Sequence, residues 1–275
     1  MKGYTSENIR NIALVGHGGS GKTTFLEAAL LAKGVISRLG RVEDGNTVSD
    51  FDKMEIEKGY SINASIVPVE HNKTKLNFID TPGFFDFVGD VNSAMRAVES
   101  AAIFVDASSG IQVGTEKAWN SCNQFDMPRF FIINKTDKEN VDVDAVIVAL
   151  KEKFGLSVML LSDRDALSEA VAETDEELME KYFDGQAFTD EEFAKGVRAG
   201  ILSRSIAPVM VCSSYKGEGI TDILDALIAF GPRPEDHPLY PATDGKGEEI
   251  EVKLGDGSPS ALVFKTIADP FLGKI

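Results

Sequence analysis

The chain has 275 residues, 43% of them hydrophobic and 26% charged, and a formal net charge of −16 at pH 7. This length is enough for one large domain with an ample core, with or without an appendage. The acidic balance argues against broad, sequence-independent binding of nucleic acid, because phosphate backbones are held by Lys and Arg, and we expect no DNA partner.

The N-terminal stretch MKGYTSENIRNIALVGHGG has neither the long apolar run nor the small-residue cleavage site of a secretory signal. No apolar stretch reaches the roughly 18 residues that a membrane-spanning helix needs. Cys122 and Cys212 lie in apolar-patterned segments, which is typical of small core residues and not of a disulfide or a metal-binding pair. We therefore expect a cytoplasmic protein with no membrane partner and, since no feature indicates a stable oligomer, a monomer.

Short β-rich runs alternate with helical patterns along the chain. The predicted strands cover residues 12–15, 76–79, 101–105, 130–133 and 209–212. The predicted helices begin at Lys22 and at about Val88, and apolar residues at helical spacing predict two more over 143–150 and 220–228. This alternation predicts an α/β fold with a doubly wound, mostly parallel sheet, whose ligand lies beyond the carboxyl ends of the strands.

Residues 163–200 depart from this alternation. They are acidic and contain two capping-box patterns, Thr174 with Glu177 and Thr189 with Glu192, each followed by apolar helical spacing. We predict a small helical insert over about 163–200. Its charge is typical of a solvated face, and a docking surface is the alternative.

Residues 233–259 carry several prolines and glycines, which is typical of a linker. After them, SALVFKTIADPFLGKI, residues 260–275, begins a new alternating strand. We therefore predict a main domain over 1–232, a linker over 233–259 and the first strand of a further, truncated domain over 260–275.

The stretch GHGGSGKTT follows a predicted strand and opens a predicted helix, which is the context that a phosphate loop needs. Its glycines let backbone N–H groups close around phosphate oxygens at a helix N-terminus. Lys22 supplies a cation to the β- and γ-phosphates, and the Thr23 hydroxyl is a ligand for Mg²⁺. The alternative is a glycine-rich turn that only caps a helix. The predicted phosphate-binding residues are Gly16, His17, Gly18, Gly19, Ser20, Gly21, Lys22, Thr23 and Thr24.

The turn DTPG, made of Asp80, Thr81, Pro82 and Gly83, ends the second predicted strand. Asp80 is placed where a phosphate-loop protein holds Mg²⁺, directly or through water. The Gly83 N–H can reach a γ-phosphate. Without the phosphate loop, the same turn is equally typical of a purely structural feature.

The stretch NKTD, residues 134–137, follows another predicted strand and indicates the base. Asp137 can accept hydrogen bonds from the N1–H and the exocyclic amine of guanine, a donor pair that adenine lacks. Loss of such a contact in a dry pocket costs about 1 to 3 kcal/mol. Asn134 would brace the neighbouring loops, and the Lys135 stem would lie along the purine face.

The stretch CSSYKG leaves the last predicted strand of the sheet. We place Ser213, Ser214 and Tyr215 beside the base, with the Ser214 backbone N–H offered to guanine O6. The four motifs, each at the end of a strand, are together much more specific than any one of them.

With these motifs the chain resembles the translational GTPases, and most closely elongation factor G in its divergent second form. The first switch of that family resembles GRVEDGNTVSDFDKMEIEKGYSI, and its second switch with the following strand resembles DTPGFFDFVGDVNSAMRAVESAAIFVDASSGIQVGTEKAW. The helical part of its inserted subdomain resembles ETDEELMEKYFDG, and the opening of its β-barrel domain resembles FKTIADPFLGKI. The resemblance implies a P-loop NTPase sheet of the translational G-domain type over 1–232, followed by the start of a truncated β-barrel.

The resemblance also implies an activity: GTP hydrolysis with GTP/GDP and Mg²⁺, on the ribosome, in translocation or recycling. The large subunit would stimulate turnover, and the ribosomal stalk protein would meet the helical insert. A factor that protects or recycles ribosomes is one alternative. A GTP-binding docking module that does not hydrolyse is another.

Carried over by position, Ser61 is the switch hydroxyl that binds Mg²⁺, together with Thr23 and Asp80. Gly19 stands where the family often has an Asp linked to a monovalent cation. Phe84 replaces the histidine that orients the attacking water. The catalytic positions that the resemblance implies are therefore those of Lys22, Gly83 and Phe84. Since Phe84 has no lone pair, we expect slow intrinsic hydrolysis; the alternative is that Phe84 packs as a hydrophobic gate while another group orients the water.

Two features depart from the family pattern. The stretch between Asn134 and Ser213 is shorter than the resemblance implies, and the strands of the inserted subdomain that would lie near 157–165 are not evident.

Overall fold

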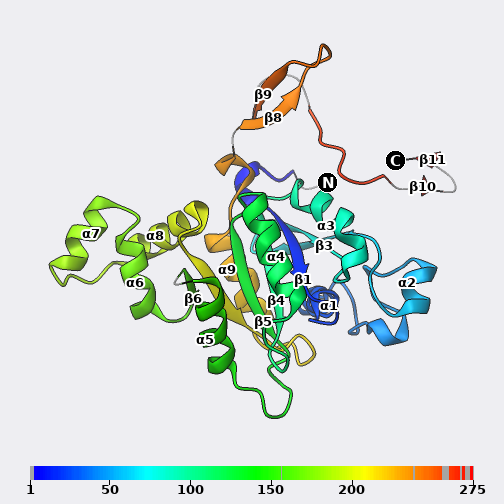
Figure 1. Ribbon diagram of the computed structural model, residues 1–275, viewed down its shortest axis with the longest axis horizontal. Helices are drawn as coiled ribbons and strands as arrows, with labels where there is room; N and C mark the ends of the chain where they lie inside the picture. The colour runs from blue at the N-terminus through cyan, green and yellow to red at the C-terminus, as the bar shows by residue number, and fades with distance from the viewer. Residues whose placement is uncertain are drawn as a thin grey trace.

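A seven-stranded sheet with the order β2-β3-β1-β4-β5-β7-β6 lies at the centre of the protein (Figure 1). The computed structural model describes residues 3–155, 157–237, 239–255, 260–266, 268–269 and 273–274. Only β2 runs antiparallel to its neighbour; the other pairs are parallel. The seven strands are β1 (Ile9–Gly16), β2 (Ser65–His71), β3 (Thr74–Asp80), β4 (Ser100–Asp106), β5 (Arg129–Asn134), β6 (Val158–Leu160) and β7 (Ala207–Val211).

Helices cover both faces of this sheet, as a doubly wound fold requires. The α-helices are α1 (Lys22–Ala32), α2 (Lys53–Lys58), α3 (Val88–Met95), α4 (Val113–Gln124), α5 (Val143–Phe154), α6 (Arg164–Ala172), α7 (Glu176–Phe183), α8 (Asp190–Ser203) and α9 (Ile220–Phe230). Short 3₁₀ turns cover Ser6–Asn8 (η1), Val42–Asp44 (η2), Phe85–Phe87 (η3) and Pro234–Asp236 (η4). The predicted α/β class and mostly parallel sheet are confirmed.

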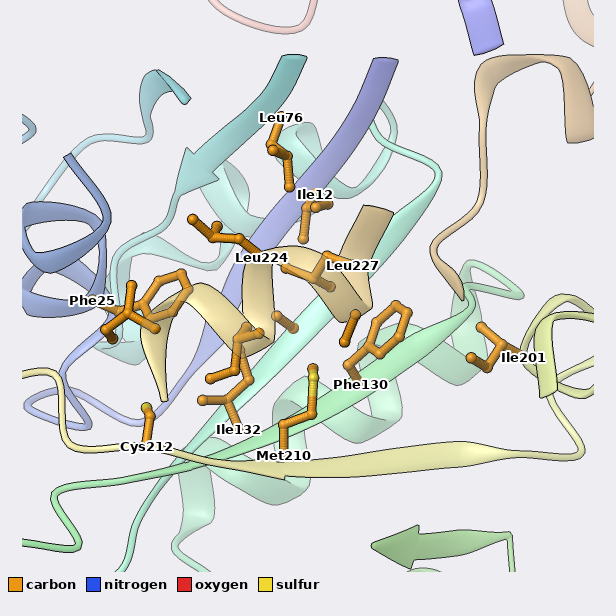
Figure 2. Packing of buried hydrophobic residues seen from close by; sticks show 14 of the residues in the cluster. Ile12, Phe25, Leu76, Phe130, Ile132, Ile201, Met210, Cys212, Leu224 and Leu227 are labelled. Carbon is orange, nitrogen blue, oxygen red and sulfur yellow. The ribbon is translucent and has the colours of Figure 1, made fainter. Parts of the chain in front are cut away.

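Side chains of alternate strand residues pack into two separate hydrophobic clusters, one on each face of the sheet. In β1, Ile12 and Leu14 join the cluster under α1 and α9, whereas Ala13 and Val15 join the cluster under α3, α4 and α5. Figure 2 shows the first cluster, in which Leu224 and Leu227 of α9 face the strands. Because both faces of the central strands β4, β5 and β7 are buried, these strands are apolar at nearly every position and not in alternation. This is why continuous apolar runs identified them in the sequence.

All five predicted strands correspond to strands of the sheet, although β7 ends at Val211, so Cys212 lies just outside it. The sequence analysis missed β2 and β6. Strand β2 is the antiparallel edge, with alternating buried and exposed residues. The three residues of β6 pair in parallel with β7, so the stretch near 157–165 contributes a strand to the main sheet.

Three helices, α6, α7 and α8, occupy the stretch expected to form an insert and gather at one side of the molecule (Figure 1). The Thr189–Glu192 capping box is confirmed at the start of α8. The Thr174–Glu177 box is wrong. The N-cap of α7 is Asp175, whose carboxylate accepts from the Glu177 N–H at 3.0 Å, while the Thr174 hydroxyl donates to the Val171 carbonyl at the end of α6.

The segment after α9 contains a β-hairpin where the sequence analysis expected a linker. Strands β8 (Leu239–Thr243) and β9 (Glu249–Lys253) pair antiparallel. The described residues 260–266 belong to no helix or strand, while β10 (Ala268–Asp269) pairs with β11 (Gly273–Lys274). The other residues of the predicted strand over 260–275 lie outside the described residues.

Leu224 tests the packing of α9 on the sheet. Its side chain is 0% exposed. We expect Leu224→Ala to lower the free energy of unfolding by about 2 to 5 kcal/mol, because the truncation leaves a cavity in a close-packed core. Val148→Ala on α5, where the side chain is 55% exposed, is the matched control and should cost little. Denaturant titration measures both; equal losses would contradict this account of the core.

Glu99 predicts a pH dependence of stability. This residue precedes β4, is 7% exposed, and its Oε2 has no hydrogen-bond partner among the described residues. Burial raises the pKa of Glu99 to about 7, against a hydrogen bond from Asn11 that lowers it. The folded protein therefore binds this proton more tightly than the unfolded chain does, and ionisation of Glu99 removes stability as the pH rises from about 4.5 to about 7.

Glu99→Gln, which cannot ionise, should flatten this dependence. We expect the free energy of unfolding of the variant, relative to wild type, to be higher at pH 8 than at pH 5 by on the order of 2 to 3 kcal/mol. Urea titrations of both proteins across this range measure it. Parallel curves for the two proteins would show that Glu99 ionises normally in the fold.

Candidate functional site

A cavity of about 500 Å³ lies where β1, β3, β5 and β7 end, and the loop between α1 and β2 forms a further wall. The residues named in the sequence analysis that line it are Gly18, Gly19, Gly21, Lys22, Thr23, Thr24, Ser61, Gly83, Phe84, Asn134, Lys135, Asp137, Ser214 and Tyr215. The other residues named there, Gly16, His17, Ser20, Asp80, Thr81, Pro82 and Ser213, are not part of this lining. Four motifs that are far apart in sequence thus meet at one place.

The glycines of the phosphate loop allow close backbone approach. Gly16 has φ 134°, and a Cβ there would lie 2.6 Å from the carbonyl oxygen of Phe104 on β4. A Cβ on Gly83 would lie 2.5 Å from the Cα of Gly18, so the turn after β3 packs directly on the phosphate loop. A side chain at either position would therefore push the loop out of place.

Lys22, the first residue of α1, is 6% exposed. Its Nζ donates to the carbonyl oxygens of Gly16 at 3.3 Å and His17 at 3.1 Å. Burial lowers the pKa of Lys22 to about 8, although Asp80 and Asp50 favour its charged form. The direct partners of this buried cation are neutral carbonyls, so an anion in the cavity would stabilise it.

Hydroxyl and carboxylate oxygens converge beside Lys22. Asp80 Oδ2 accepts from the Thr23 hydroxyl at 2.7 Å and from the Ser49 hydroxyl at 3.0 Å, and the Ser61 hydroxyl lies 3.4 Å from that of Thr23. Asp80 Oδ1 is buried without a partner among the described residues. Burial raises the pKa of Asp80, against Lys22 and the hydroxyl donors, which lower it.

Asp50 adds a second carboxylate to this corner. It is 4% exposed, it lines the cavity, and its Oδ2 has no partner within the described part of the chain. Burial and the neighbouring Asp80 raise the pKa of Asp50 to about 6, while a hydrogen bond from Ser61 lowers it. Hard oxygen donors with unpartnered carboxylate atoms fit Mg²⁺, which neutralises such a cluster and completes its shell with phosphate oxygens and water.

The sequence analysis missed Ser49 and Asp50. Both lie in the stretch that resembles the first switch, but only the hydroxyl of Ser61 was carried over from it. Their position depends on how the loop between α1 and β2 folds back on the sheet, and neither residue stands in a short motif. The SD pair formed by Ser49 and Asp50, which begins twelve residues before Ser61, was the available signal.

Two buried glutamates order this loop: Glu27 ties it to α1, and Glu55 ties two parts of the loop to each other. Glu27 of α1 accepts from the backbone N–H groups of Gly40 at 3.0 Å and Val48 at 2.6 Å. Glu55 of α2 accepts from Ile62 and Asn63, both at 2.9 Å. Each glutamate is 2% exposed, and buried carboxylate acceptors of this kind fix backbone strongly. The loop is therefore ordered around the cavity.

Phe84 stands at the edge of the cavity, 44% exposed. Its ring centroid lies 4.6 Å from that of Tyr60, which also lines the cavity. A Cβ on Gly18 would lie 3.2 Å from the Phe84 ring, so the ring sits directly over the phosphate loop. The Phe84 side chain contributes an apolar surface here and no hydrogen-bonding group.

Asn134 connects the two ends of the cavity. Its Nδ2 donates to the carbonyl oxygen of Ser20 at 3.1 Å, and its Oδ1 accepts from the Ser214 N–H at 3.0 Å. These two hydrogen bonds join the phosphate loop to the loop after β7, which is consistent with the bracing role predicted for Asn134. The Ser214 N–H donates to Asn134 here, and its assignment to guanine O6 stays a prediction.

Asp137 and Lys135 are also held in place. The Ser213 hydroxyl donates to Asp137 Oδ1 at 2.6 Å, which fixes that carboxylate against the cavity. Lys135 Nζ donates to the Gly19 carbonyl at 2.5 Å and pairs with Asp106 Oδ2 at 2.9 Å. Although burial would raise the pKa of Asp106, hydrogen bonds from Ser108 and the lysines hold it well below its usual range.

Thr81 supports the site without lining it. Its side chain is 0% exposed, and its hydroxyl donates to the Leu14 carbonyl at 2.6 Å. The sequence analysis placed Thr81 in the binding set because it lies within the DTPG turn. In the structure its hydroxyl instead ties the end of β3 to β1. This hydrogen bond holds the backbone next to Asp80 in place.

Comparison with known proteins agrees with this geometry. Residues 7–233 match the family model described as the elongation factor Tu GTP binding domain. The fold is also similar to the crystal structure of a protein from Thermus thermophilus, with a TM-score of 0.85 and 28% sequence identity. That match covers 98% of this chain and 44% of the Thermus chain, so this chain spans less than half the length of that protein.

Within the described residues, no helix has the length and apolar character that crossing a membrane requires. The family model covers far more than half of the 275 residues and spans the phosphate loop, the DTPG turn, the NKTD stretch and Ser213 to Tyr215. The chain therefore belongs to the elongation factor Tu GTP-binding domain family, the GTP-binding domains of the translational GTPases.

Proposed function

We propose that the chain is the GTP-binding and GTP-hydrolysing part of an elongation factor G-like translation factor that acts on the ribosome. The observation that carries this proposal is that Lys22 and Asp137, 115 residues apart, line one cavity of about 500 Å³. A cation at one end and a carboxylate at the other match the phosphates and the guanine edge of one nucleotide.

At the phosphate end, Lys22 binds the β- and γ-phosphates, and the backbone N–H groups around Gly18 to Gly21 close on the phosphate oxygens. The start of α1 at Lys22 adds its partial positive charge. We assign the Gly83 N–H to the γ-phosphate, since Gly83 packs directly on Gly18 of the phosphate loop. These groups position the phosphates and stabilise charge that develops on them during hydrolysis.

Thr23, Ser61 and Asp80 would hold Mg²⁺, with Ser49 and Asp50 close enough to support it directly or through water. When bound, Mg²⁺ neutralises the β- and γ-phosphate oxygens. The buried, unpartnered oxygens of Asp80 and Asp50 support this assignment. Since Gly19 has no carboxylate, we propose no second, monovalent cation at the phosphate loop.

At the base end, Asp137 accepts from the N1–H and exocyclic amine of guanine. The Ser213 hydroxyl fixes the carboxylate in that position. Adenine offers neither donor, and Asp137 would be left without a partner against it, so the pocket selects guanine. The Lys135 stem covers one face of the purine while its Nζ stays on the Gly19 carbonyl.

Hydrolysis is proposed to be slow without a partner. The Phe84 ring occupies the edge of the cavity over Gly18 but has no lone pair to orient a water molecule. Loss of such a contact in other enzymes costs about 10²- to 10³-fold in rate. The same observation supports a second candidate, a GTP-binding docking module that does not turn over, with Phe84 and Tyr60 as an apolar gate.

Action on the ribosome rests on the family and on the resemblance to elongation factor G. We propose the large subunit and its stalk protein as partners, translocation or recycling as the step, and the cytoplasm as the location. Residues 1–232 would form the G domain of a monomer. The chain would deliver a nucleotide-dependent signal to domains outside it, since the Thermus protein that it matches is more than twice as long.

Asp137 tests the base specificity. We expect the wild-type protein to bind GTP and GDP and to exclude ATP in equilibrium competition against a fluorescent GDP analogue. Asp137→Asn replaces one carboxylate oxygen by an NH2 group, which cannot accept a hydrogen bond from guanine. The substitution should weaken GTP binding about 5- to 150-fold and leave ATP binding nearly unchanged. Glu139→Gln, the same loss of charge at an exposed position nearby, is the control. Unchanged selectivity in Asp137→Asn would remove Asp137 from the base pocket.

Phe84 tests the cause of slow turnover. We expect Phe84→His to raise single-turnover GTP hydrolysis on ribosomes by about 10²-fold or more, because imidazole can orient water, with little change in GTP affinity. Phe85→His is the control, since Phe85 is 43% exposed and lies outside the lining of the main cavity. Equal rates for wild type and Phe84→His would show that another group orients the water. No phosphate release by wild type with ribosomes would favour the docking module.

A further inference from the structure

Arg41 and Tyr215 meet at the open side of the cavity. Arg41 precedes η2 in the loop after α1, and Tyr215 follows β7, so the two residues belong to different walls, and both line the cavity. Arg41 Nη2 donates to the Tyr215 hydroxyl at 2.7 Å, and the guanidinium carbon lies 5.3 Å from the centroid of the Tyr215 ring. This contact joins walls that are 174 residues apart in the chain.

The backbone that carries Arg41 is held from the inside of the protein. The preceding residue, Gly40, donates its N–H to the buried carboxylate of Glu27 on α1. The Arg41 N–H donates to Asn46 Oδ1 at 2.7 Å, which closes the turn around η2. The turn that presents the guanidinium is therefore fixed, and the main entropy lost in the contact with Tyr215 is that of ordering the Arg41 side chain.

The backbone that carries Tyr215 is held in the same way. Ser214 donates its N–H to Asn134, and Lys216 donates its N–H to the Ser213 hydroxyl at 3.2 Å. The same Ser213 hydroxyl donates to Asp137, the residue that reads the base in the proposed function. Tyr215 thus stands at the base end of the cavity and not at the phosphate end.

We propose that Arg41 and Tyr215 form a clasp that closes over the base and ribose half of a bound guanine nucleotide and slows its release. This inference rests on the proposed function. The nucleotide cannot leave by this side without separating the guanidinium from the tyrosine hydroxyl and ring. Because the clasp lies at the base end, it retards GTP and GDP by the same factor, unlike groups that contact the γ-phosphate or Mg²⁺.

The expected effect is moderate. The Tyr215 side chain is 57% exposed, so water competes for both the hydrogen bond and the cation–π contact. We expect Arg41→Ala to raise the dissociation rate of nucleotide about three- to tenfold. Tyr215→Phe removes only the hydroxyl and keeps the ring, so it should raise the rate about two- to fivefold.

The test is a stopped-flow measurement of release of fluorescent GDP and of a fluorescent, slowly hydrolysed GTP analogue. The proteins are wild type, Arg41→Ala, Tyr215→Phe and the double variant. The matched control is Arg164→Ala, because the Arg164 guanidinium lies over the Phe193 ring at 4.4 Å but in the helical insert, away from the cavity. Thermal midpoints of all variants check that the fold is retained.

The clasp predicts three results together: faster release in both single variants, the same factor for both nucleotides, and a double variant no faster than Arg41→Ala, since the two side chains act as one contact. Independent, multiplicative effects in the double variant would overturn it, as would faster release of the GTP analogue alone. If both single variants release nucleotide at the wild-type rate, the clasp is overturned and the proposed function still stands. Failure of wild type to bind either nucleotide would overturn both.

Discussion

The side chain of Asn134 is the link on which the site depends. One end donates to the phosphate loop at Ser20, and the other accepts from Ser214 beside the base end. It is 1% exposed and lies at the carboxyl end of β5, so the central sheet sets its position. The spacing between the phosphate end and the base end is therefore fixed by a buried amide before any ligand arrives. Because the two ends of the site are already at the right spacing, a ligand that contacts both ends binds with a smaller loss of protein entropy.

The loop between α1 and β2 is built to the same principle. Glu27 and Glu55 each accept hydrogen bonds from at least two backbone N–H groups of this loop. These bonds order the loop so that Ser49, Asp50 and Ser61 lie close to Asp80. The oxygens of this corner are costly to bury without a cation, and Lys22 nearby is costly to bury without an anion. A metal-bound polyphosphate satisfies both needs at once, which explains why these opposite charges form no ion pair with each other within the described part of the chain.

Much of this could be predicted from sequence, because the phosphate loop, DTPG and NKTD are short motifs whose chemistry depends on residues adjacent in the chain. Their apolar strands are buried on both faces and so are easy to recognise. What could not be predicted depends on long-range folding: the part of Ser49 and Asp50 in the metal corner, the meeting of Arg41 with Tyr215, and the use of Thr81 as a tie to Leu14. The cap at Asp175 was missed for a local reason, since Thr174 and Asp175 are both good caps and the end of α6 occupies Thr174.

The central claim is that one guanine nucleotide spans from Lys22 to Asp137. A crystal structure of the protein with GDP and Mg²⁺ tests it most directly. The account predicts Lys22 Nζ within about 3 Å of a β-phosphate oxygen, and the Asp137 carboxylate within about 3 Å of both the guanine N1 and the exocyclic amine. A nucleotide bound with its base away from Asp137, or its phosphates away from Lys22, would contradict it.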